Sequence, residues 1–109
     1  MIKENLNDKD FQPITEIDRI IHEPSRFLIM AYLSVVDSAD FLFLFNQTGL
    51  TKGNLSSHLS KLEDAGYIEI NKKFVGKIPR TLLRLTKKGR MAFQAYRKKI
   101  GKVLNELSE

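Results

Sequence analysis

The sequence predicts a mainly α-helical domain that carries one small antiparallel β hairpin, and three observations support this class. Apolar residues recur at helical spacing over most of the chain. Between residues 67 and 86 they alternate with polar residues instead, in two runs separated by the turn residue Gly76. A length of 109 residues with 42% hydrophobic residues suits a single domain with one small core.

Composition limits the classes of protein to consider. Charged residues make up 28% of the chain, and no apolar stretch is long enough to span a bilayer. The N-terminus lacks the basic patch, apolar run and cleavage site of a secretory signal, so we expect a cytoplasmic protein without a membrane partner. The absence of cysteine excludes disulfides and thiolate metal sites.

Charge is unevenly distributed along the chain. Residues 1–40 contain four Lys or Arg and eight Asp or Glu, a net charge of −4, whereas the whole chain has +5. The remainder therefore has a net charge of +9. This segregation predicts a basic face for a polyanion, and nucleic acid suits such a face better than a membrane surface.

The first third of the chain predicts two helices. Residues 1–12 show no sustained period and are expected to form a flexible arm. Isoleucines at helical spacing predict a short amphipathic helix over residues 13–22, whose apolar stripe needs a partner. Pro24 suits the first position of a second helix, which we expect to run to about Val36 in the centre of the core.

Residues 41–48 allow two interpretations. The run Phe-Leu-Phe-Leu-Phe could be a buried strand, but its first, fourth and fifth residues also share one face of a helix, which we favour. Leu42 and Phe43 would then face solvent and mark a contact surface. A strand, or a helix buried on all sides, would hide them.

Residues 51–66 predict a helix with two different faces, and with the helix before it and a turn at Gly49 this makes a helix-turn-helix. Three leucines at spacings of four and three form a packing face, and small polar residues lie opposite. Thr51 suits the N-cap and Gly66 a left-handed stop. Lys52 lies at the positive end of the helix dipole, which an approaching polyanion would explain. The plain alternative is a solvated helix with accidental charges.

The expected hairpin at residues 67–86 has more positive charge than a two-stranded ribbon needs for stability. A wing that touches phosphate needs such charge, although lysines also protect an exposed edge strand from pairing with other chains. The cations are Lys72, Lys73, Lys77, Arg80 and Arg84.

The last helix is predicted to start after its cap, Thr86, and to reach about Leu107. Its apolar residues repeat at spacings of three and four, which is a heptad seam. The seam could fold back on its own domain, but it is longer than so small a core usually covers. We therefore expect a dimer contact, with the isoleucine stripe of the first helix packed across it.

No enzyme is expected. His22 and His58 lie on different elements, and no cysteine or paired carboxylate joins either of them at ligand spacing. No nucleophile motif or phosphate-cradling Gly-rich loop is present. We therefore expect no catalytic residue, no metal and no cofactor, and we expect His58 to pack or hydrogen-bond beside the polar face of the helix at 51–66.

Several segments carry a resemblance to a known family over roughly residues 20–100. These segments are residues 50–59, 62–68, 74–77, 79–81 and 85–90, with Pro24 and Arg26 upstream. In them the sequence resembles the small winged helix-turn-helix transcriptional regulators related to the multiple-antibiotic-resistance (MarR-like) and arsenical-repressor groups.

The resemblance implies a homodimer that binds double-stranded DNA and regulates transcription. The winged helix-turn-helix domain would span residues 13–86, and residues 87–109 would form a dimerisation helix packed on the same domain. The helix at 51–66 would enter the major groove, while the wing at 67–86 would lie along the backbone or minor groove. The alternative is a winged-helix protein-interaction module that reads no DNA, and a small-molecule effector remains open.

Two sets of site residues follow. DNA contacts are expected from Thr51, Lys52, Gly53, Asn54, Ser56, Ser57, Lys61, Lys72, Lys73, Lys77 and Arg80. The dimer interface is expected from Ile14, Ile17, Ile21, Phe93, Tyr96, Ile100, Val103 and Leu107.

Overall fold

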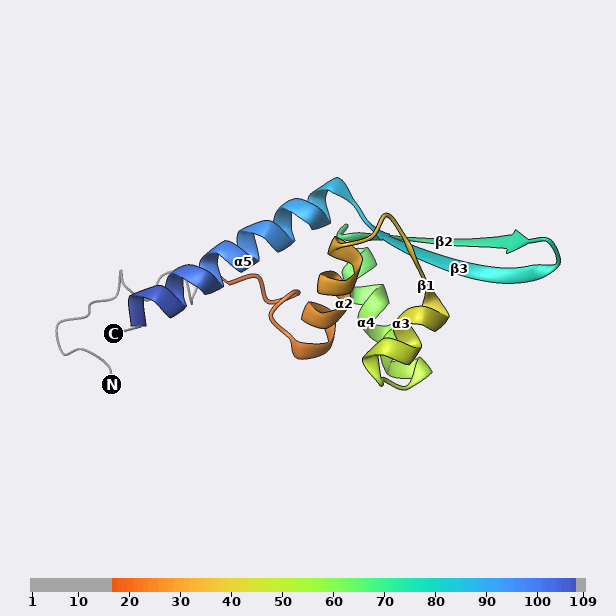
Figure 1. The fold of residues 1–109 in the computed structure, drawn as a ribbon, viewed down its shortest axis with the longest axis horizontal. Helices are drawn as coiled ribbons and strands as arrows, with labels where there is room; N and C mark the ends of the chain where they lie inside the picture. Colours follow the sequence, from red (N-terminus) through yellow and green to blue (C-terminus); the bar gives the residue numbers. More distant parts are fainter. Residues whose placement is uncertain (1–16, 108–109) are drawn as a thin grey trace.

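A computed structural model of the protein describes residues 17–107. Its elements, in chain order, are α2 (Pro24–Ser34), β1 (Ala39–Asp40), α3 (Phe41–Thr48), α4 (Lys52–Asp64), β2 (Ile68–Val75), β3 (Ile78–Leu85) and α5 (Lys87–Leu107). Helices α2, α3 and α4 gather beside the base of the hairpin, and the hairpin and α5 extend away from them in opposite directions (Figure 1). The predicted class, mainly α with a small antiparallel hairpin, is confirmed.

The sheet is antiparallel, with the strand order β1-β3-β2. Strands β2 and β3 form the predicted hairpin, which we call the wing, and pair from Ile68 with Leu85 out to Val75 with Ile78. Strand β1 was not predicted. It pairs its two residues with the middle of β3 and so ties the start of α3 to the wing.

The core lies where the three clustered helices meet the base of the wing. Its fully buried side chains come from α2, α3, α4 and β3, and from one residue that precedes α2. They are Ile21, Ile29, Met30, Leu33, Leu44, Leu55, Leu62 and Leu83. The packing face predicted for the helix at 51–66 therefore does face the core.

Both predicted ends of α4 are confirmed. The side chain of Thr51 accepts a hydrogen bond from the backbone N–H of Asn54 at 3.1 Å, as an N-cap does. At the other end Gly66 has a φ of 82°, which is costly for any residue with a side chain. The N–H of Tyr67 donates to the carbonyl of Leu62 at 2.9 Å. This reversal sends the chain directly from α4 into β2.

Helix α3 confirms the favoured interpretation of residues 41–48. Leu44 is fully buried, whereas Leu42 is 53% exposed and Phe43 is 45% exposed. The ring of Phe43 makes an edge contact with Tyr32, with 6.1 Å between ring centroids. The side chain of Asp40 caps the helix by accepting from the N–H of Leu42 at 2.8 Å.

The helix predicted over residues 13–22 is wrong in its described part, because residues 17 and 18 have no regular structure and residues 19–23 form turns and bends. The carboxylate of Asp18 accepts from the N–H groups of Ile20 and Ile21 at 2.8 and 3.2 Å, which offers the backbone an alternative to a helix. The hydroxyl of Tyr67 donates to the same carboxylate. Burial, together with Asp18, raises the pKa of Tyr67 to about 12, so this hydroxyl keeps its proton at neutral pH. Residues 1–16, including the expected arm, lie outside the described residues.

Candidate nucleic-acid interface

The α4 residues that are expected to contact DNA lie on the outer face of this helix. Because Leu55, Leu59 and Leu62 bury the opposite face, the polar side chains point away from the core. Small side chains with two lysines among them leave room for close approach to a groove. The residues exposed here are Thr51, Lys52, Gly53, Asn54, Ser56, Ser57 and Lys61.

Lys52 is held in place at the start of α4. Its ammonium nitrogen lies 5.7 Å from the centre of the Phe45 ring in α3, which is within the range of a cation–π contact. The residue is nevertheless exposed. The contact therefore keeps a positive charge beside the N-terminus of α4, where an anion would meet both the charge and the helix dipole.

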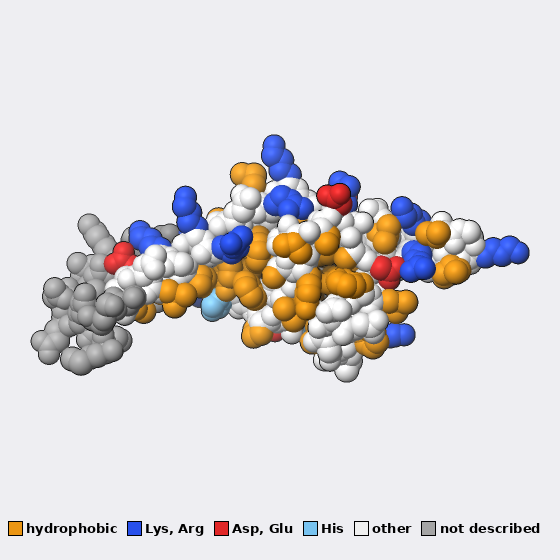
Figure 2. All heavy atoms as spheres, viewed as in Figure 1, with side chains coloured by type: hydrophobic (Ala, Val, Ile, Leu, Met, Phe, Trp, Pro, Cys, Tyr) orange, Lys and Arg blue, Asp and Glu red, His pale blue; other side chains and the backbone are white. Residues whose placement is uncertain are grey.

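The wing carries the second group of expected DNA contacts. Lys72, Lys73 and Lys77 are exposed, and no ion pair joins them to another residue between 17 and 107. Residues 70–105 contain no Asp or Glu. Beyond Glu69, therefore, the wing has no carboxylate that could offset the charge of these lysines. Figure 2 shows basic side chains along the projecting hairpin and at its outer end.

Arg80 differs from the lysines of the wing. Its guanidinium lies 3.1 Å from the carboxylate of Asp40 in β1, so part of its charge is already engaged within the chain. The N–H of Leu42, and then the Arg80 guanidinium, outweigh burial and lower the pKa of Asp40 below its ordinary value. Arg80 is therefore an anchor between β3 and β1 as well as a wing cation.

The α4 face and the wing flank a common cleft of about 690 Å³. Ser56 and Ser60 line it from α4, and Lys72 and Thr81 line it from the wing. The two groups of expected DNA contacts therefore adjoin each other on one side of the molecule, although they come from separate elements.

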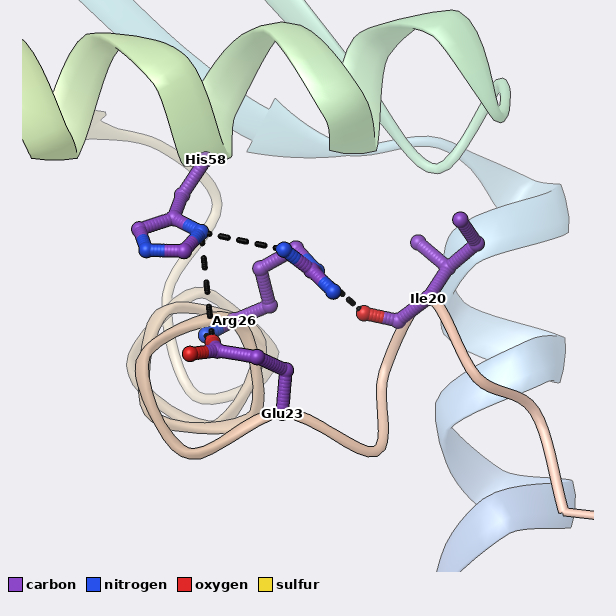
Figure 3. Close-up of polar contacts among 4 residues, drawn as sticks. All are labelled: Ile20, Glu23, Arg26 and His58. Carbon is purple, nitrogen blue, oxygen red and sulfur yellow. Dashed lines mark hydrogen bonds and ion pairs between the residues drawn. The ribbon is translucent and has the colours of Figure 1, made fainter.

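A polar cluster behind α4 involves a residue to which the sequence assigned no role. Arg26 of α2 is only 9% exposed. Its Nη1 lies 3.1 Å from Nδ1 of His58 in α4, and its Nε donates to the carbonyl of Ile20 at 2.6 Å (Figure 3). The expected hydrogen bond of His58 is thereby confirmed. The sequence indicated Arg26 only through the family resemblance, because a hydrogen-bond partner 32 residues away leaves no local pattern.

Glu23 completes this cluster by capping α2. Its carboxylate accepts from the N–H of Arg26 at 2.8 Å and lies 3.9 Å from Nδ1 of His58. Burial acts to raise the pKa of Glu23, but the backbone hydrogen bond and the nearby positive charge outweigh it and lower the pKa. The carboxylate is therefore ionised at neutral pH and faces the buried guanidinium.

Part of the expected dimer interface is occupied within the chain itself. Phe93 and Tyr96 are 5% and 8% exposed, and Ile21 is fully buried. The rings of Phe93 and Tyr96 lie 5.9 and 5.8 Å from that of Phe27 in α2. The Tyr96 hydroxyl is also 2.8 Å from Nδ1 of His22. Phe93 and Tyr96 hold α5 against α2, so little of their surface is left for a second chain.

The remaining residues of the seam lie on the part of α5 that extends beyond the clustered helices (Figure 1). Ile100 and Val103 are half-buried, and Leu107 is 43% exposed. Ile17 is half-buried against the core, and Ile14 lies outside the described residues. The surface left for a second chain is thus the outer half of the predicted seam.

Other classes of site find little support in the described part of the chain. Between residues 17 and 107, no group of three or more His, Asp or Glu side chains is placed to hold a metal ion. No helix in that range is both long and apolar enough to cross a bilayer.

The comparison with known sequences decides the family. Residues 25–104 match the winged helix DNA-binding domain family. The chain belongs to this family. A relative from Methanocaldococcus jannaschii, the uncharacterised protein MJ0432, is 36% identical over 78 residues, which is 72% of this chain and 85% of the relative.

Solved structures of winged-helix proteins share the fold. A transcriptional regulator homologue from Pyrococcus horikoshii OT3 superposes with a TM-score of 0.83 and 27% identity, over 93% of this chain and 99% of that one. A structure described as a MarR-like transcription regulator, from Bacillus cereus ATCC 10987, gives a TM-score of 0.66 and 19% identity, over 91% of this chain and 66% of that one. The resemblance is confirmed, and this winged-helix chain is a DNA-binding protein of the transcriptional-regulator type.

Proposed function

We propose that the protein is a sequence-specific regulator of transcription that binds double-stranded DNA as a homodimer. Helix α4 acts as its recognition helix in the major groove, and the wing lies along the phosphate backbone or in the minor groove. The observation that carries the proposal is that an exposed polar α4 face and a wing with five cations and a single carboxylate, Glu69, flank one cleft.

The division between the two elements follows from their side chains. Asn54, Ser56 and Ser57 are short donors and acceptors on a helix, and such groups can reach base edges in a major groove that is wide enough for a helix. The wing lysines have long flexible stems and no directional acceptor, so they suit phosphate oxygens, which are the same at every sequence. Recognition and affinity thus come from different elements.

The homodimer is supported by the outer half of α5. The apolar stripe of α5 continues from Ile100, which packs at the edge of the core, to Val103 and Leu107 farther along the helix. Pairing two such stripes would place two recognition helices on one face of DNA, about one helical turn or roughly 34 Å apart. The preferred site would then be a near-palindrome.

Salt dependence of duplex binding tests the proposal. Duplexes selected from a random pool would be labelled, and the dissociation constant followed by fluorescence anisotropy over a range of salt concentration. We expect the logarithm of the binding constant to fall linearly with the logarithm of salt, with a slope of about −0.9 for each phosphate contacted. The double variant Lys72→Ala, Lys77→Ala removes four lysines from a homodimer, so it should make the slope less steep by about 3.6.

A matched control removes the same charge elsewhere. Lys98 and Lys102 are exposed on α5, so Lys98→Ala with Lys102→Ala should leave the slope nearly unchanged. Binding that is weak for every selected duplex and insensitive to salt would instead favour a winged-helix module that contacts proteins. Equal losses in both double variants would mean that net charge, and not the wing, drives binding.

A further inference from the structure

The outer end of the wing is apolar, although it lies beyond the core. Phe74 is 73% exposed, Val75 is 56% exposed and Ile78 is 58% exposed, and Pro79 beside them is exposed as well. They form the last two cross-strand pairs of the hairpin, Val75 with Ile78 and Phe74 with Pro79. Figure 2 shows hydrophobic side chains directly behind the basic outer end of the hairpin.

These residues occupy both faces of the ribbon. Because side chains alternate along a strand, Phe74 points to the same side as Lys72, which lines the cleft toward α4. Val75 and Ile78 point to the opposite side. An apolar end on both faces adds little to the stability of the core, so these side chains mark a contact surface.

The charges around the tip identify the kind of partner. Lys77 lies in the turn itself, and Lys73 and Arg80 form the third cross-strand pair from the turn. No carboxylate occurs between residues 70 and 105. The partner must therefore accept large apolar groups within a few ångströms of several cations. A DNA groove meets both demands, because phosphates form its walls and stacked bases its floor.

We propose that Phe74, with Val75 and Ile78, forms an apolar wedge that enters the minor groove and opens a base step next to the site read by α4. This inference rests on the proposed function and extends it. Two strands lie about 4.8 Å apart, so with side chains on both faces the tip is wider than the roughly 6 Å minor groove of B-DNA. Entry requires a widened groove and a kink toward the major groove.

The wedge adds a second source of sequence preference. Pyrimidine–purine steps such as TA unstack and kink most easily, so they should be favoured where the wing inserts, without any hydrogen bond to their base edges. The preference would appear at fixed positions outside the contacts of α4. A wing that only touches phosphate gives no such preference.

Bending of a selected duplex tests the wedge. Duplexes labelled at both ends would report the bend by energy transfer, and 2-aminopurine at the flanking TA step would report unstacking. The wild type should bend the duplex and raise the 2-aminopurine fluorescence. Phe74→Ala should weaken binding by about tenfold, the scale of one lost aromatic–base stack, and abolish both signals at saturation. Lys77→Ala should weaken binding but keep the bend at saturation.

Matched valines supply the control. Val75 lies at the wing tip and Val35 lies after α2, where it is 79% exposed. Val75→Ser should reduce the bend, whereas Val35→Ser should leave affinity and bend unchanged. Phe74→Leu should keep most of the bend, because the wedge needs bulk and not an aromatic ring alone. Thermal unfolding of each variant should match the wild type, since the tip lies outside the core.

The outcomes separate the two proposals. A wild type that binds no duplex overturns the proposed function and the wedge with it. A wild type that binds with the expected salt slope, while Phe74→Ala binds and bends equally well, overturns the wedge alone. If Phe74→Ala instead lowers the sedimentation coefficient of the free protein, the tip is a contact between copies and the wedge is overturned.

Discussion

The guanidinium of Arg26 in α2 lies 3.1 Å from Nδ1 of His58 in α4, so a partly buried hydrogen bond joins the central helix to the proposed recognition helix. Arginine can only donate, so Nδ1 of His58 is the acceptor in this hydrogen bond. A second bond, from Arg26 to the carbonyl of Ile20, fixes the guanidinium from the other side. The position of α4 therefore depends on this pair as well as on its leucines.

A double-mutant cycle should detect the coupling between these two residues. We expect Arg26→Met and His58→Ala each to lower the free energy of unfolding by about 1 to 3 kcal/mol, because each leaves a buried polar group without its partner. The double variant should lose about 1 kcal/mol less than the sum of the single variants. Urea unfolding of the wild type, the two single variants and the double variant measures the four free energies of unfolding.

The exposed pair of Arg84 and Glu69 is the matched control for this cycle. Its charged atoms are also 3.1 Å apart, but its side chains are 56% and 49% exposed. Exposed ion pairs contribute about 0 to 1 kcal/mol, so Arg84→Met with Glu69→Ala should show little coupling. Equal interaction free energies in the two cycles would mean that burial does not strengthen the contact between Arg26 and His58.

Local patterns predicted most of the fold. Thr51 and Gly66 bracket α4 because capping and left-handed stops depend on one residue type at one position. The alternation of residues 67–86 predicted the wing, since one face of its base packs on the core. The exposed polar face of α4 followed from the same argument, because its leucines are the residues that the core needs.

Features set by distant residues escaped prediction. Strand β1 has two residues and therefore no period, and Arg80 finds Asp40 across 40 positions of the chain. The seam of α5 has the same spacing whether its own chain or a second one covers it, so the burial of Phe93 against Phe27 was invisible. At Asp18 a side chain replaced helical hydrogen bonds that the isoleucine spacing had favoured.

Gly89 should be essential to the junction between the wing and α5. A Cβ atom on Gly89 would lie 2.0 Å from the carbonyl oxygen of Tyr67 and 2.7 Å from its carbonyl carbon, and neither backbone atom can move freely. That oxygen also accepts the N–H of Thr86 at 3.0 Å. Gly89→Ala should therefore lower the free energy of unfolding by about 1 to 3 kcal/mol or more, as overpacking does.

Gly101 is the matched control in the same helix. A Cβ atom there would meet nothing within 4 Å, so only the helix propensity changes. Gly101→Ala should raise the free energy of unfolding by about 0.5 to 1 kcal/mol. Opposite signs in thermal or urea unfolding are expected for the two variants. A stabilised Gly89→Ala protein would show that α5 can move away from Tyr67 without cost.

Variants of the wing and of α4 should affect DNA binding in different ways. Lys77→Ala should weaken binding to the selected site and to random DNA alike, because phosphates carry no sequence information. Arg80→Ala should do the same to a smaller extent, since Asp40 already engages its charge. Asn54→Ala or Ser57→Ala should reduce the difference between the two DNAs by roughly 1 to 3 kcal/mol if a base contact is lost. Competition binding measures both constants, and equal losses on both DNAs for all four variants would refute this division.

The burial of half the α5 seam narrows the prediction about assembly. Charges introduced at Phe93 or Tyr96 would disrupt the chain's own packing, so they cannot test a dimer. Ile100 is half-buried at the edge of the core and Val103 is half-buried farther along α5, so both can be changed with less damage to the core than Phe93 or Tyr96.

Ile100→Glu with Val103→Glu should split the dimer, because two carboxylates on each chain would be forced into an apolar contact without partners. Sedimentation at tens of micromolar should give a monomer for this variant and a dimer for the wild type. Asn105→Glu adds a charge to the exposed side of the same helix and should leave the dimer intact. The split variant should still bind a half-site duplex, but its affinity for the near-palindrome should fall to that of one half-site. A wild type that is already monomeric at this concentration would contradict the dimer, and so would a charged variant that sediments as the wild type does.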